Sequence, residues 1–168
     1  MCRLTVVAAI ATLVCELSNL CAAPEKRIDL AAIVSKKDAE STLGKAVKDP
    51  QPRNEEGADG HYSRCNYYSQ NPGRSLVLRV HQASVGQLAP AKQREELLAG
   101  NGKIKPLPGF GDKAALASEG AQNDLAHLLM LYVVKGAAFV TVGIGSLNDE
   151  KATLEKAKML PRKILAKL

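Results

Sequence analysis

The sequence predicts an α+β domain with a mostly antiparallel sheet of about five strands and helices packed on one face. Two observations carry this prediction. Residues 61–69 and 75–83 have strand patterns separated by turn residues, which indicates a hairpin. Residues 127–145 form a very apolar stretch that Lys135 and Gly136 divide into two strand-length arms. With helical patterns around these hairpins, the expected order is helix-β-β-helix-β-β-β-helix.

Residues 1–23 have the pattern of a secretory signal peptide. Arg3 and the free amine form a positive start, residues 4–14 form a short apolar run, and Ala22 and Ala23 provide small residues for cleavage. The run is shorter than the roughly 20 residues that a membrane-spanning helix needs. We therefore expect an exported protein, either periplasmic or extracellular.

The cysteines limit how the mature protein is held together. Cys15 and Cys21 lie near the end of the leader, but each follows a branched apolar residue, so a lipoprotein signal is the less favoured interpretation. After cleavage only Cys65 remains, which excludes an internal disulfide. Residues 24–168 are expected to form a single α+β domain stabilised by its core.

The charge pattern does not favour a nucleic-acid partner. The formal net charge is +6, but the positive residues are scattered, and no compact basic block carries stacking aromatic residues. At most, this excess predicts peripheral contact with an anionic membrane surface or polymer.

The first helix has clear boundaries. Ser35 and Asp38 have the spacing of a capping box, and Gly44 is placed to end the helix in a left-handed conformation. Residues 45–59 carry two prolines, charged residues and glycine, so they are interpreted as an exposed connection.

The first predicted hairpin places chemically distinct residues on its two faces. In residues 61–69, His61, Ser63, Cys65 and Tyr67 share one face, and Tyr62, Arg64, Asn66 and Tyr68 share the other. Residues 75–83 alternate in the same way: one face carries Leu76, Leu78 and Val80, and the other face carries Val77, Arg79 and His81.

The rest of the chain is interpreted more coarsely. Residues 89–102 are expected to be a short helix, and a loop rich in proline and glycine then leads to a strand over 114–118. Residues 148–168 are expected to form a helix that Pro161 kinks or splits.

Metal binding and thiol catalysis both centre on Cys65. A metal site would use His61, Cys65 and His81, but positions 61 and 65 of a strand lie roughly 13 Å apart, which is too far for one ion. A nucleophilic Cys65 would need His81 or His127 as its base and a polar, partly exposed setting. A thiol in the middle of a strand is more typical of a small buried residue, so neither metal nor catalytic residues are predicted.

Other catalytic patterns are weak. The glycines of residues 108–114 have no third glycine and no following helix, so a tight turn in which Asp112 bonds its own backbone is favoured over a nucleotide loop. The carboxylate pairs at 55–56, 95–96 and 149–150 do not lie in apolar surroundings. No cofactor is predicted.

The apolar hairpin of residues 127–145 is the feature that calls for a partner. Both of its faces are apolar, so the face without helices needs a second protomer, a small apolar ligand, a partner protein, or cover from the chain's own loops and last helix.

We predict a non-enzymatic binding protein with its ligand on the sheet or at the glycine turn. The predicted lining is Cys65, Tyr67, Phe110 and Tyr132. The alternatives are a small exported enzyme or redox protein using Cys65, and a structural homodimer formed through this hairpin.

Several short motifs occur in a familiar order: Leu-Gly at the end of the first helix, a Cys-x-Tyr strand, a Gly-x-Gly-Asp-x-Ala turn, an apolar hairpin and a closing helix. Their residues are Leu43, Gly44, Cys65, Tyr67, Gly109, Gly111, Asp112 and Ala114. In this the sequence resembles the uncharacterised secreted or lipid-anchored envelope domains of bacteria that are known only as domains of unknown function. The resemblance implies an extracytoplasmic α+β domain without an established catalytic site.

Overall fold

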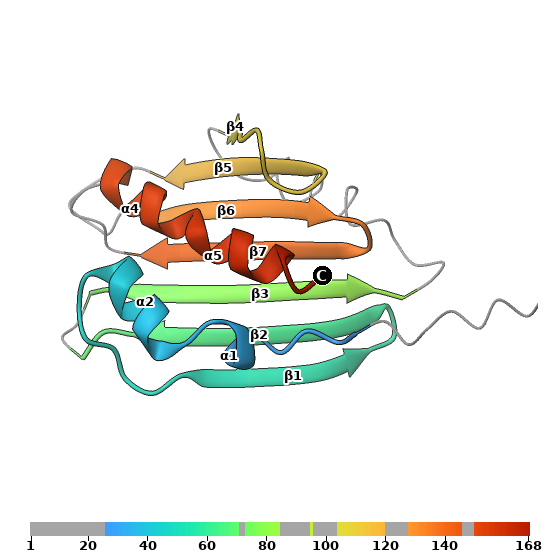
Figure 1. Ribbon diagram of the computed structural model, residues 1–168, viewed down its shortest axis with the longest axis horizontal. Helices are drawn as coiled ribbons and strands as arrows, with labels where there is room; N and C mark the ends of the chain where they lie inside the picture. The colour runs from blue at the N-terminus through green and yellow to red at the C-terminus, as the bar shows by residue number, and fades with distance from the viewer. Residues whose placement is uncertain (1–25, 71–72, 85–94, 96–103, 120–127, 146–149) are drawn as a thin grey trace, which may run out of the picture.

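The chain is built on an antiparallel sheet with the strand order β1-β2-β3-β7-β6-β5-β4 (Figure 1). This computed structural model describes residues 26–70, 73–84, 95, 104–119, 128–145 and 150–168. The strands are β1 Gln51–Gly57, β2 Gly60–Tyr68, β3 Ser75–Ala83, β4 Ile104–Pro106, β5 Lys113–Glu119, β6 Leu128–Lys135 and β7 Ala138–Gly145. The helices are α1 Leu30–Ile33, α2 Lys36–Leu43, α4 Glu150–Ala157 and α5 Met159–Leu165.

The α+β class and both hairpins are confirmed, but the predicted strand number and element order are wrong. The sheet has seven strands. The two additional strands are its edges: β1 lies in the segment predicted as a connection, and β4 has only three residues. Every residue of β1 is exposed, so its sequence lacks the alternation that marks a half-buried strand. Two short helices precede β1, and the helix predicted over residues 89–102 lies outside the described residues except for Glu95.

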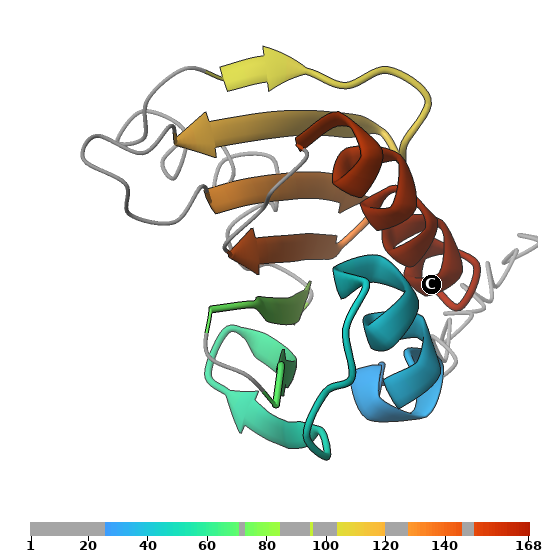
Figure 2. The same ribbon diagram turned by 90° about the vertical axis from the view of Figure 1, so that its left-hand side faces the viewer.

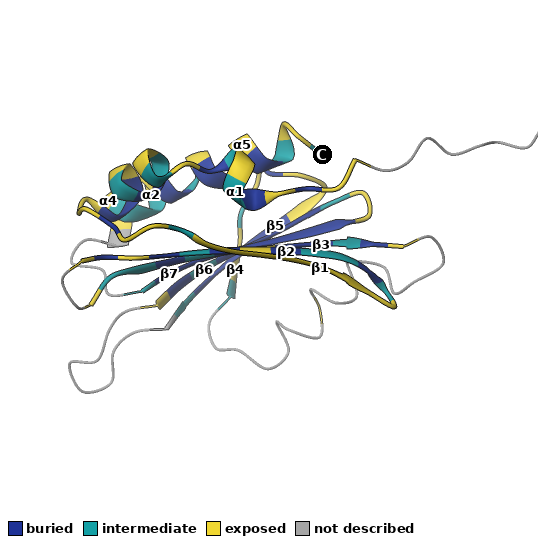
Figure 3. Cartoon of the chain, turned by 90° about the horizontal axis from the view of Figure 1, so that it is seen from below, coloured by how far each residue is buried: buried dark blue, intermediate teal, exposed yellow. Residues whose placement is uncertain are grey.

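The described helices all cover the same face of the sheet (Figures 2 and 3). We call this the near face and the opposite one the far face. Side chains of the near face pack with α1 and α5 in one apolar cluster that includes Leu30, Leu78, Val142, Leu160 and Ile164. Alternation along β2, β3, β6 and β7 sends every second residue into this cluster.

The ends of the helices follow the sequence signals. Ser35 and Asp38 form the capping box of α2, and Gly44 ends the helix with φ 65°. The C-terminal helix is split at Lys158. Pro161 is the third residue of α5 and lies in its first turn, where its missing N–H costs no hydrogen bond. None of the described helices is long and apolar enough to cross a membrane.

The glycine turn before β5 is fastened to the turn between β6 and β7. Asp112 N donates to Val134 O at 2.7 Å, and Gly136 N donates to Asp112 Oδ2 at 2.7 Å. Asp112 was expected to bond its own backbone, but this carboxylate holds a turn 24 residues away. Gly111 is required beside it, because its φ is 51° and a Cβ there would lie 2.3 Å from Val134 O.

Candidate ligand-binding site

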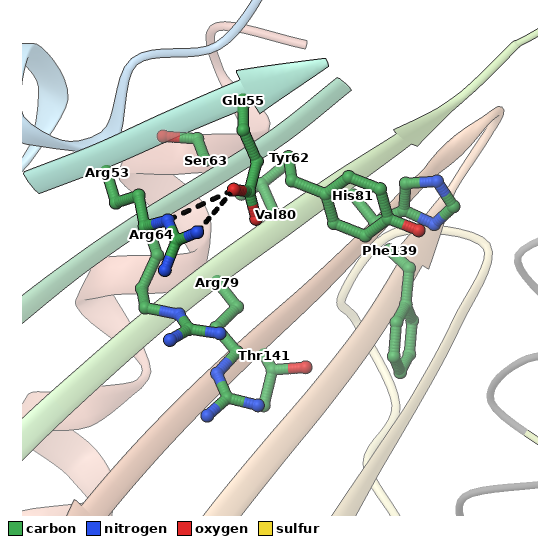
Figure 4. Close-up of a pocket in the computed structure, with 10 residues that line it drawn as sticks. All are labelled: Arg53, Glu55, Tyr62, Ser63, Arg64, Arg79, Val80, His81, Phe139 and Thr141. Atoms are coloured by element: carbon green, nitrogen blue, oxygen red, sulfur yellow. Dashed lines mark hydrogen bonds and ion pairs between the residues drawn. The ribbon is translucent and has the colours of Figure 1, made fainter. Parts of the chain in front are cut away.

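A cavity of about 460 Å³ lies over β1, β2, β3 and β7, and its side chains belong mainly to the far face (Figure 4). This volume is in the range of small-molecule sites. The lining residues are Arg53, Glu55, Tyr62, Ser63, Arg64, Arg79, Val80, His81, Phe139 and Thr141.

Three arginines form one row across the cavity. The strand register places Arg53 opposite Arg64, and Arg64 opposite Arg79. Thr141 of β7 continues the row beyond Arg79. Like charges directly opposite each other on neighbouring strands repel, so this arrangement is unfavourable for folding unless anions offset it.

Only one of these arginines has its charge matched within the described part of the chain. Arg53 forms an ion pair with Glu55, with Nε and Nη2 at 3.0 and 2.9 Å from Oε2 (Figure 4). Among the described residues, Arg64 and Arg79 make no hydrogen bond or ion pair, and both side chains are exposed. Two guanidinium groups are therefore available to an anion.

An aromatic pair forms one end of the cavity. Tyr62 is opposite His81, and their rings stack with centroids 4.2 Å apart and planes 4° from parallel. Tyr62 OH donates to Asp59 Oδ2 at 2.5 Å. Burial and this hydrogen bond raise the pKa of Tyr62 to about 12. Tyr62 is therefore a neutral, flat surface at ordinary pH.

The floor of the cavity comes from the central strand β7. Phe139 is opposite His81, and Thr141 is opposite Arg79. Phe139 also stacks on Tyr132, with ring centroids 6.1 Å apart, in a small apolar cluster with Ala117 and Val134. The cavity thus has a cationic part on β1 to β3 and an apolar part beside β7.

The four side chains that the sequence suggested as lining do not come together. Cys65 and Tyr67 lie on the near face with no exposed surface. Phe110 packs in the same near-face cluster, below the guanidinium of Arg162 at 5.0 Å. Tyr132 lies on the far face, so the sheet separates it from the other three.

The residues of the metal and thiol sites that were weighed from the sequence and not favoured are also separated. His61 Nδ1 lies 2.7 Å from Glu56 Oε1, and His61 Nε2 lies 3.1 Å from Ile28 O. The His61 side chain is therefore on the near face, whereas the His81 side chain is on the far face. In the described segments, no group of three or more His, Cys, Asp or Glu residues could hold a metal ion. His127 lies outside the described residues.

Sequence reasoning missed the arginine row, although part of the signal was present. Alternation had already placed Arg64 beside Tyr62, and Arg79 beside His81, on matching faces of the first hairpin. Counting back from the turn would have paired Arg64 with Arg79. Arg53 had no such signal, because its segment was interpreted as a connection.

No family model, curated protein or solved structure matches the chain. The resemblance to bacterial envelope domains stays an expectation.

Proposed function

We propose that the protein is an exported, non-enzymatic binding domain of the cell envelope whose ligand occupies the far-face cavity. The observation that carries the proposal is the lining itself. Four hydrogen-bonded strands hold cationic and aromatic side chains at fixed spacing around a cavity of about 460 Å³. Such a concave site on a rigid sheet suits a small molecule, because little conformational entropy is lost when it binds. The leader pattern of residues 1–23 supports export.

The surroundings of the nucleophiles favour binding over catalysis. The Cys65 side chain is fully buried, and this burial raises the pKa of its thiol, although the Tyr67 hydroxyl acts in the opposite direction. Ser63 Oγ donates to Asn54 Oδ1 at 2.7 Å and accepts from Leu30 N at 3.0 Å, so it is engaged on the near face. Neither group is presented to the cavity as an activated nucleophile.

The apolar hairpin also does not depend on a second copy for its burial. Strands β6 and β7 are internal, with β5 and β3 as their outer neighbours. Seven of the eight residues of β7 are buried, on both faces of the sheet, within one chain. This weighs against a homodimer built on the hairpin.

Native mass spectrometry of the protein, produced from the full chain and purified from the envelope fraction without reductant, tests this proposal. We expect a monomer that has lost its leader and carries extra mass that denaturation removes. A bare monomer would contradict a co-purifying ligand, a doubled mass would favour the homodimer, and a retained leader would contradict export by cleavage.

A further inference from the structure

We propose that the far-face cavity recognises a small amphipathic anion: a carboxylate or phosphate held by Arg64 and Arg79, with an apolar, flat body over the aromatic floor. This inference rests on the proposed function and names the class of its ligand.

The cationic part of the cavity has the chemistry of an oxyanion site. The permanently charged cations in the lining are all arginines, whose planar guanidinium forks match the paired oxygens of carboxylate and phosphate. Residues directly opposite each other in antiparallel strands have Cα atoms about 4.5–5.5 Å apart. Arg64 and Arg79 are such a pair, so their guanidinium groups can converge on one anion.

The neighbouring charge places the anion at these two residues. Glu55 already occupies the fork of Arg53, and its own charge repels an anion from that end of the row. Arg64 and Arg79 lack such a counter-charge among the described residues. An oxyanion bound between them would also relieve their mutual repulsion, which adds to its affinity.

The adjoining surface selects the body of the ligand. The half-buried Tyr62 ring, which stacks on His81, and the edge of the largely buried Phe139 ring line the cavity beside the arginines. A free inorganic anion would contact only the arginines, whereas a ring or other flat apolar group could also pack against the part of Tyr62 and Phe139 that lines the cavity. The ligand is therefore amphipathic rather than a simple ion.

Isothermal titration of the mature protein with probes that share one ring system tests the inference. The probes are 2-naphthoate, 2-naphthyl phosphate, the uncharged methyl ester of the naphthoate, and inorganic phosphate alone. We expect at least one of the two naphthyl anions to bind. The methyl ester and inorganic phosphate should each bind at least about tenfold more weakly than that anion. The comparison of the two anions distinguishes a carboxylate from a phosphate ligand.

Arginine variants identify the residues responsible. Arg64→Gln and Arg79→Gln should each weaken binding of the anionic probe about tenfold. Arg27→Gln is the matched control, because Arg27 is an exposed arginine paired with Glu56 outside this cavity. It removes the same charge and should leave the affinity unchanged. A melting curve for each variant verifies folding.

Three results would overturn the inference. They are equal binding of ester and acid, unchanged affinity in both cavity variants, and failure of all probes to bind. The first two would leave a cavity that binds by apolar contact, and the proposed function would stand. In the third case, native mass spectrometry still decides the proposed function independently.

Discussion

At the scale of single residues, Cys65 and Tyr67 act as parts of the core. Cys65 has no exposed surface, and Tyr67 beside it donates its hydroxyl hydrogen to the carbonyl oxygen of Val34. That hydrogen bond anchors the segment between α1 and α2 to β2. Burial raises the pKa values of both side chains, so neither ionises at neutral pH.

The burial of Cys65 makes its reactivity a direct test of the enzyme and redox alternatives. In the folded mature protein, iodoacetamide should alkylate Cys65 on the order of a hundredfold more slowly than in guanidinium chloride, because the thiol must first be exposed by opening of the structure. Mass spectrometry of timed samples measures both rates. Rapid labelling without denaturant would contradict this structure of β2 and support a reactive thiol.

At the scale of elements, α2 is held at its first turn by residues from two parts of the chain. Asp38 accepts from Ser35 N at 2.7 Å in the capping box and from Lys163 Nζ of α5 at 2.7 Å. Partial burial alone would raise the pKa of Asp38, but the hydrogen bonds from Lys163 and Ser35 outweigh it and hold this pKa below its ordinary value.

Asp38→Asn should therefore lower the free energy of unfolding at pH 7 by about 1 kcal/mol. A folded-state pKa below the unfolded value means that the stabilising contribution is complete above the unfolded pKa. It disappears as the pH falls through the folded value. The difference between wild type and variant should thus shrink below about pH 4. Urea unfolding at several pH values measures it.

Asp49→Asn is the matched control for this prediction. Asp49 also pairs with a lysine, Lys36, at 2.9 Å, but its side chain is 92% exposed. An exposed pair contributes little, so we expect a change below about 0.5 kcal/mol. Equal losses in the two variants would show that the capping position of Asp38 has no special role.

At the scale of the whole molecule, the two faces of the sheet differ in packing and in charge. The near face packs against helices in a continuous apolar cluster. The far face instead aligns like charges across β1, β2 and β3, an arrangement that costs stability. Under the proposed anion binding, this stored repulsion would add to the affinity for the anion at the expense of the stability of the free protein.

Arg79→Gln should consequently stabilise the ligand-free protein while reducing ligand-induced stabilisation. Removal of one like charge should raise the free energy of unfolding by about 0.5 kcal/mol. The increase in Tm that 2-naphthoate or 2-naphthyl phosphate produces in the wild type should shrink, because this increase depends on affinity. Thermal melts with and without probe measure both effects. A variant less stable than wild type, with an unchanged probe effect, would contradict the prediction.

Features set by neighbours along the chain were determined by the sequence alone. The capping box at Ser35, the left-handed Gly44, the Gly136 reversal and the break before Pro161 all depend on interactions within a few residues. The alternation of residues 75–83 likewise showed which side chains share a face. Hence the α+β class and both hairpins could be predicted, and with them the faces of Arg64 and Arg79.

Only the tertiary structure decided how the two hairpins and the edge strands join into one sheet and which face the helices cover. Pairing of β3 with β7 brings Phe139 and Thr141 beside His81 and Arg79, across about 60 residues of chain. Pairing with β2 turns the polar β1 segment into an edge strand and adds Arg53 to the row. Such pairings follow from the total burial of the core and from hydrogen bonds between distant segments, and no local pattern encodes them.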